Sequence, residues 1–203
     1  MMTNLYDAPI DTRFNHLYRV MRSDRFLQMQ GLSNEVPFFI FPFKPEEQND
    51  IEKLGKSLIT NLEKAGVRIR KANLYDIAID LLKEAGIFEQ ILLDEKNITR
   101  KELLEDLKGV LDPEKYVVPA IVEKMEENPY DILFITGIGE VYPYIRSHNI
   151  LNNLQRFANN HPTLLFYPGQ YSFSQDGGST LRLFNTLPNS RYYRAFNILE
   201  YQI

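Results

Sequence analysis

Four short segments with strand-like patterns, separated by stretches of helical periodicity, constrain the fold of this chain most strongly. They predict strands at residues 36–41, 67–73, 130–136 and 163–168. The first and third segments are almost unbroken apolar runs, which is typical of strands buried on both faces of a parallel sheet. The alternation of such strands with helices predicts an α/β fold.

Apolar residues at helical spacing fill the gaps between these strands. We expect helices at about 10–22, 45–66 and 74–86, and a helical insert at about 87–128. Within the insert, Thr99 followed by Glu102 predicts a capping box. Further along, Ser147 is expected to cap a helix that runs through Leu154.

The end of the chain completes the expected architecture. Residues 180–187 suggest a short helix, and residues 192–201 suggest a last strand. We therefore predict one α/β domain over residues 1–203, built on an open, mostly parallel, Rossmann-like sheet of about five strands. Helices cover both faces of this sheet, and the helical insert separates the second strand from the third.

The composition is that of an ordinary globular protein. Hydrophobic residues make up 44% of the 203 residues, and the net charge is −4. No apolar run approaches the roughly 18 residues that span a bilayer, so we expect no membrane segment. The first residues lack the pattern of a signal peptide, and cysteine is absent. Both observations suit a cytoplasmic protein.

The charge is distributed unevenly along the chain. Up to Gly139 there are 18 basic and 24 acidic residues, whereas from Glu140 onward there are five basic and three acidic residues. All five of these basic residues are arginines, and twelve Tyr or Phe residues lie among them. Arg and aromatic residues are enriched in protein interfaces and also bind single-stranded nucleic acid. The alternative interpretation is core aromatics with solvated arginines.

The sequence Gly137-Ile138-Gly139 after the third strand suggests a dinucleotide-binding turn, but its context opposes that interpretation. The third glycine of the motif is replaced by Tyr142, and Glu140 places negative charge where a pyrophosphate would lie. Gly55-Lys56-Ser57 likewise matches the end of a P-loop, but Asp50 stands at the position of the first glycine. Lys56 is therefore predicted to lie on the surface of a helix.

Other catalytic patterns are also absent from the sequence. The three histidines, His16, His148 and His161, have no partners at metal-ligand spacing, and there is no G-x-S-x-G nucleophile motif. We therefore expect no cofactor, no metal and no catalytic site. One alternative stays open, in which Glu35, Asp76, Glu140 and His148 converge at the strand ends.

Six stretches together resemble the BrxB family of bacterial BREX phage-defence systems. The resemblance runs from about residue 26 to residue 198, and its motifs occur in the family's order. The stretches are QGLSNEVPFFIFPF, NLYDIAIDLL, LDPEKYVVPAI, DILFITGIGEVYPYIRSHNILNNLQ, PTLLFYPGQY and YYRAFNIL.

This resemblance implies a cytoplasmic component of a system that methylates host DNA and blocks replication of unmethylated phage DNA. The other components include a large ATPase, a methyltransferase and the alkaline-phosphatase-like protein PglZ. The family has no established catalytic residues to carry over. Other BREX proteins are the implied partners, and PglZ is the one that we expect.

Two functions remain in competition. The first is a non-catalytic scaffold or adaptor, and the alternative is a subunit that binds or processes nucleic acid through its Arg- and aromatic-rich C-terminal third. The sequence leaves the oligomeric state open. The candidate partner-binding residues are Tyr142, Arg146, His148, Tyr171, Arg182, Arg191, Tyr192 and Arg194.

Overall fold

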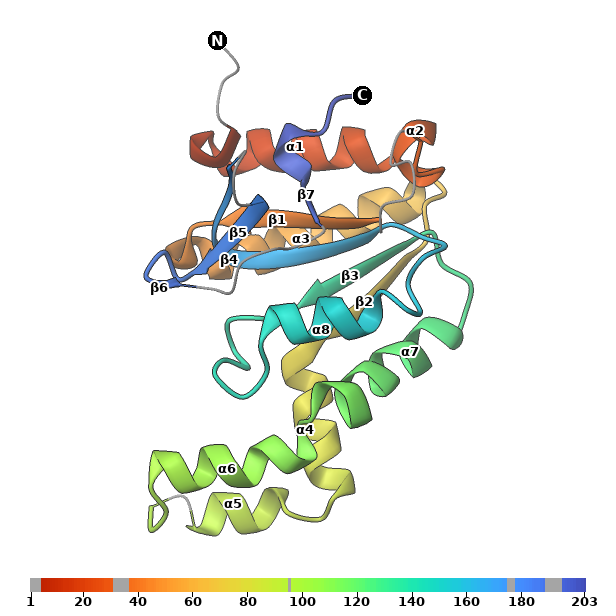
Figure 1. Cartoon of the computed structure of the whole chain (residues 1–203). Coiled ribbons are helices and arrows are strands. Elements are labelled where there is room, and N and C mark those ends of the chain that lie inside the picture. The colour runs from red at the N-terminus through yellow and green to blue at the C-terminus, as the bar shows by residue number, and fades with distance from the viewer. Residues whose placement is uncertain (1–4, 31–36, 95, 175–177, 189–194) are drawn as a thin grey trace.

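The computed structural model describes residues 5–30, 37–94, 96–174, 178–188 and 195–203 (Figure 1). Its strands form one sheet whose main path runs β2-β3-β4-β1-β7, and every pair of neighbours on this path is parallel. The strands are β1 (Phe38–Phe43), β2 (Ile69–Asn73), β3 (Ile132–Thr136), β4 (Thr163–Ser174), β5 (Gly178–Leu183), β6 (Leu187–Pro188) and β7 (Phe196–Asn197). The predicted open, parallel-dominated α/β sheet is confirmed, and so are its four predicted strands.

Helices cover both faces of the sheet (Figure 1). The α-helices are α1 (Ile10–Met21), α2 (Asp24–Leu27), α3 (Gln48–Lys64), α4 (Leu74–Glu84), α5 (Phe88–Asp94), α6 (Arg100–Val110), α7 (Val118–Glu126) and α8 (Ser147–Leu154). Shorter helical turns are η1 (Leu5–Asp7), η2 (Pro45–Glu47), η3 (Pro113–Val117) and η4 (Ile198–Glu200). The predicted capping box of Thr99 and Glu102 is present at the start of α6.

Side chains of the central strands alternate between two hydrophobic cores. Phe39 and Phe41 of β1 face α1 and α3, whereas Phe38 and Ile40 face α4, α7 and α8. All four are almost completely buried. Because successive side chains of a strand point to opposite faces, an unbroken apolar run is what a strand between two helical layers requires.

The prediction of a short helix at residues 180–187 is wrong. The structure places β5 there, antiparallel to the second half of β4, and then a turn and β6. Leu181 and Leu183 are buried and Arg182 is exposed, which is strand alternation. Pairing with the long β4 decides the conformation of this segment, because tertiary contacts override weak local propensity.

Two smaller predictions also need correction. The last strand predicted over residues 192–201 is present but shorter in the described part, because β7 covers only Phe196–Asn197 and is followed by η4. The side chain of Asn197 accepts a hydrogen bond from the backbone N–H of Leu199, which starts that turn of helix. Ser147 does not cap α8 but is its first residue, and Arg146 is the N-cap.

Helices α5 and α6 extend away from the sheet beyond the end of α4 (Figure 1). We call residues 88–94 and 96–110 the α5–α6 segment. None of the residues of α5 is buried, and Leu107 is the one buried residue of α6. In the described part of the chain, no helix is both long and apolar enough to cross a membrane.

Candidate functional site

The carboxyl ends of β1, β2 and β3 and the middle of the long β4 border a cleft of about 290 Å³ on the α3 side of the sheet. Phe43, Phe134 and Phe166, from three neighbouring strands, form its apolar floor. Ligands of open parallel sheets bind beyond the carboxyl ends of the strands. The cleft therefore lies where this fold can build a binding site.

Helix α3 forms the opposite wall of the cleft. Its residues Ile51, Leu58 and Leu62 are buried in the core. The residues that it presents to the cleft follow the i, i+3, i+4, i+7, i+8, i+11 pattern of one helix face and are Gln48, Ile51, Glu52, Gly55, Lys56 and Ile59. One helix thus serves both the core and the cleft.

Gly55 lies in the interior of α3 and lines the cleft. Glycine inside a helix costs about 0.5–1 kcal/mol relative to alanine. A Cβ atom built at this position would meet no atom within 4 Å. Packing therefore does not require glycine here, whereas a larger side chain at residue 55 would extend along the cleft wall.

Four charged side chains line the cleft. Lys56 comes from α3 and Lys71 from β2, and neither forms an ion pair with a described residue. Glu52 accepts a hydrogen bond from the side-chain amide of Gln48 at 2.7 Å. Partial burial, followed by repulsion from Glu52 and Asp76, raises the pKa of Glu140, and Lys71 opposes this rise. Positive and negative groups thus share one small cavity.

Thr136, the last residue of β3, adds a neutral polar group to the cleft lining. Its hydroxyl oxygen is buried and has no hydrogen-bond partner among the described residues. A buried hydroxyl without a partner costs about 1–3 kcal/mol. The end of β3 thus carries an unsatisfied polar group next to the cleft.

The two glycines after β3, Gly137 and Gly139, allow the turn to pack closely against neighbouring residues. Gly137 has φ +81°, and a Cβ on it would lie 2.5 Å from Oδ1 of Asn73. That oxygen caps α4 by accepting hydrogen bonds from the backbone N–H groups of Tyr75 and Asp76. A Cβ on Gly139 would lie 3.0 Å from the ring of Phe184. Both glycines therefore permit close packing around the cleft.

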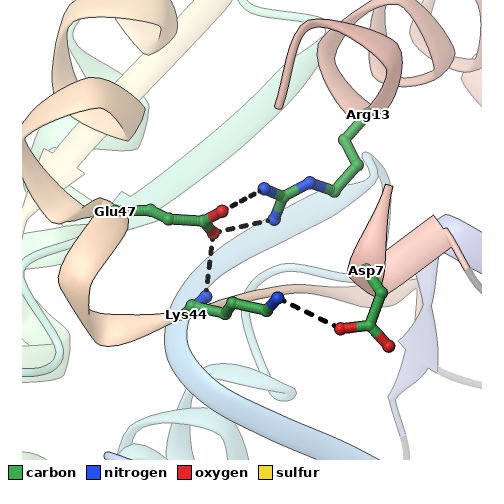
Figure 2. Close-up of polar contacts among 4 residues, drawn as sticks. All are labelled: Asp7, Arg13, Lys44 and Glu47. Atoms are coloured by element: carbon green, nitrogen blue, oxygen red, sulfur yellow. Dashed lines mark hydrogen bonds and ion pairs between the residues drawn. The ribbon is translucent and has the colours of Figure 1, made fainter. Parts of the chain in front are cut away.

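A buried ion pair holds the start of α3, and hence one end of the cleft (Figure 2). The guanidinium of Arg13 donates to both carboxylate oxygens of Glu47, at 3.0 and 2.5 Å. Glu47 also accepts a hydrogen bond from the backbone N–H of Lys44, whose side chain pairs with Asp7 at 3.1 Å. Glu47 immediately precedes Gln48, the first cleft residue of α3.

Three of the predicted partner-binding residues lie around the start of α8. Tyr142 is half-buried and packs edge-on against Phe184, with ring centroids 6.4 Å apart. Arg146 is exposed, and His148 is half-buried with an Nδ1 atom that has no described partner. Burial, and secondarily Arg146, lowers the pKa of His148.

Two further predicted residues lie on the paired strands β4 and β5. Tyr171 is half-buried, and its hydroxyl donates to the backbone carbonyl of Ala195 at 3.1 Å. Arg182 is exposed and pairs in register with Gln170. The remaining predicted residues lie outside the described part of the chain; they are Arg191, Tyr192 and Arg194.

Of the four polar residues in the alternative interpretation, Glu140 lines the cleft. Asp76 is not among the lining residues, and its negative charge contributes to the raised pKa of Glu140. His148 lies on α8, which packs on the other face of the sheet from α3, and Glu35 is outside the described residues. Sequence reasoning missed Glu52, Lys71 and Thr136, although a glycine inside a helical pattern at residue 55 is a signal for this wall.

Comparison with known proteins identifies the family. The family model described as "BREX protein BrxB" matches residues 70–198. A protein named "BREX protein BrxB" from Bacillus cereus (strain H3081.97) is 32% identical over 204 residues, covering 94% of this chain and 98% of that protein. A protein of the same name from Escherichia coli O9:H4 (strain HS) is 30% identical over 195 residues, covering 96% of this chain and 94% of that protein.

No solved structure gives a significant match to the chain. The two relatives nevertheless align with it over almost their whole lengths, and the family model covers the segment from β2 to the end of the sheet. The chain therefore belongs to the BrxB family of BREX proteins.

Proposed function

We propose that this chain is a non-catalytic scaffold subunit of a BREX phage-defence complex, and that it binds the PglZ component. Membership of the BrxB family makes it a component of a BREX system. The scaffold role is supported by an exposed apolar surface on a segment that contributes little to the hydrophobic core of the chain.

The observation that carries the proposal is the α5–α6 segment. It extends away from the sheet (Figure 1), and two neighbouring leucines of α5 are exposed, Leu92 at 53% and Leu93 at 78%. Fully burying a leucine stabilises a complex by about 1.5–3 kcal/mol. An apolar pair on an extended segment is therefore suited to contact with another protein.

The predicted residues near α8 and β5 supply a second candidate contact area. Arg146 and Arg182 are exposed, and Phe184, two residues after Arg182, is 36% exposed. Arginine and aromatic side chains are frequent among the residues that dominate binding energy. We propose that this area contributes to partner binding together with Arg191, Tyr192 and Arg194.

The test is affinity purification from cells that carry the whole gene cluster. With a tagged chain, we expect PglZ to co-purify in stoichiometric amount. Replacing Leu92 and Leu93 together by Glu should remove PglZ if α5 is the main contact, whereas Arg146→Ala with Arg182→Ala tests the second area. Recovery of the tagged chain without PglZ, under conditions where the other components are soluble, would contradict the proposal.

A nucleic-acid-binding role is the alternative, and one observation favours it. Arg146 and Arg182 are exposed and form no ion pair with a described residue, so both are available to phosphate groups. Affinity that depends on phosphate contacts falls steeply with salt, because binding releases counterions. Salt dependence therefore separates the two functions.

A further inference from the structure

The cleft at the carboxyl ends of the strands has features of a small-molecule site, and they do not depend on the scaffold function. Ligand pockets usually measure about 300–1,000 Å³. At about 290 Å³, this cleft suits a ligand at the small end of that range. It also combines an apolar floor with a few convergent polar groups, as such sites do.

One residue of the cleft wall lowers helix stability. Gly55 stands inside α3 with open space in the direction of its missing side chain, and it lines the cleft. Leucine or alanine would favour the helix more. Glycine at residue 55 therefore leaves more space in the cleft than a larger residue would, at the cost of a lower helix propensity.

The charged groups define what the ligand must carry. Lys56 lines the cleft from α3 and Lys71 from β2, both are exposed, and two ammonium groups in one cleft suit an anion such as a phosphate. Glu52 and Glu140 line the same cavity and require donors, such as hydroxyl or amino groups. A bare phosphate would satisfy the lysines and leave the carboxylates facing negative charge.

The floor adds a third requirement. Phe43, Phe134 and Phe166 line the cleft beside the charged groups, but each is at most 5% exposed, so the apolar surface that they offer is small. Such a surface suits contact with the edge of a flat ring. Thr136 also lines the cleft, and its buried hydroxyl has no described partner. Phosphate, hydroxyls and a flat ring in one small molecule are the chemistry of a nucleotide.

We infer that the cleft binds a nucleoside 5′-monophosphate, with its phosphate between Lys56 and Lys71 and its hydroxyl or amino groups on Glu52 and Glu140. The source is either a free mononucleotide or the 5′-phosphorylated end of a nucleic-acid strand. We expect ATP to bind more weakly than AMP, because the segment between β1 and Gly55 is η2 and helix, not a glycine-rich loop that would hold further phosphates.

The test is calorimetric or NMR titration of the full chain with AMP, GMP, CMP and UMP. Adenosine, inorganic phosphate and ribose 5-phosphate are the partial ligands, and a 5′-phosphorylated oligonucleotide represents the strand end. We expect saturable binding of at least one mononucleotide with a Kd below about 1 mM. Each partial ligand should bind more weakly.

Two pairs of variants make the result specific to the cleft. Gly55→Leu should abolish binding while Tm stays level or rises, and Gly109→Leu is the control, because Gly109 is a helical glycine with open space outside the cleft. Lys71→Met should weaken binding about tenfold, the loss expected for one charge-assisted hydrogen bond. Lys64→Met, an exposed lysine of α3 outside the cleft, should leave it unchanged.

Three outcomes would overturn the inference. One is the absence of binding by every mononucleotide and by the phosphorylated oligonucleotide at millimolar concentration. Another is mononucleotide binding that survives Gly55→Leu in a folded protein. The third is phosphate alone binding as tightly as the mononucleotides, which would mark an adventitious anion site.

Discussion

Arg13 is the one fully buried charged side chain in the described part of the protein, with 1% of its surface exposed. Its bidentate pair with Glu47 joins α1 to the start of α3 (Figure 2). Breaking a buried ion pair costs more than forming it gains, because the remaining charge loses its partner without regaining full hydration. The pair is therefore a sensitive point of the structure.

Arg13→Met should lower the free energy of unfolding by about 3 kcal/mol, the lower end of the range for breaking a buried pair, because Glu47 keeps some contact with water. Urea denaturation gives this value. Arg19→Met, an exposed position on the same helix, is the control and should change stability by less than about 0.5 kcal/mol. Adding Glu47→Gln to Arg13→Met should recover part of the loss, and equal effects of Arg13→Met and Arg19→Met would refute this role.

His148 gives a pH dependence whose sign follows from its burial. Its folded-state pKa is lowered, first by burial and then by Arg146, whereas in the unfolded chain it should be about 6.5. The unfolded state therefore binds the proton more readily, and stability should fall as pH decreases through about 6.5. Above that pH, both states are neutral and this contribution is constant.

The measurement is the difference in unfolding free energy between the wild type and His148→Gln at pH 7.5, 6.5 and 5.5. Because other titrating groups cancel in this difference, the wild type should lose stability relative to the variant as pH falls. The prediction is contradicted if the difference does not change with pH, or if the wild type gains stability relative to the variant as pH falls. Either result would mean that folding does not lower the pKa of His148.

The helices and strands differ in how far sequence predicts them. β1 and β3 were predictable because unbroken apolar runs need two covered faces, and α6 because Thr99 and Glu102 satisfy a known cap. β5 was not predictable from the sequence, because it pairs with the second half of β4 and its own Leu-Arg-Leu alternation is short. A site at the strand ends was considered with Glu140 among its residues, but the other charged cleft residues were missed because they come from α3 and β2, which only the fold brings together.

Substitutions in the α5–α6 segment can test partner binding without disturbing the fold. Replacing Leu92 and Leu93 together by Ser should change the free energy of unfolding by less than about 0.5 kcal/mol per residue, because both side chains are exposed. The affinity for PglZ should fall at least about tenfold, since apolar contact area is lost. Phe157→Ser is the matched control, an exposed apolar residue beyond the end of α8.

These variants are compared by urea denaturation and by titration with purified PglZ. If the leucine variant is folded and binds PglZ as the wild type does, the contact does not involve α5. If Phe157→Ser weakens binding while the leucine variant does not, the partner lies on the α8 side of the molecule.

At the scale of the whole molecule, the chain combines a three-layer body with an extended helical segment and a cleft at one edge of its sheet. The two proposed partner areas are α5 and the area with Arg146 and Arg182. The proposed nucleotide cleft involves different residues, from α3 and the strand ends. Each proposal can therefore fail without the other. Family membership is common to both.

The most direct test of the scaffold function is titration of the purified chain with purified PglZ and, separately, with DNA, at about 50 and 200 mM salt. The scaffold function predicts a defined complex with PglZ whose affinity changes little across this range, since a packed interface releases few counterions. Arg146→Ala with Arg182→Ala should reduce any DNA binding and leave most PglZ binding in place. No complex with PglZ, together with DNA binding that falls steeply with salt and is lost in that double variant, would contradict the account.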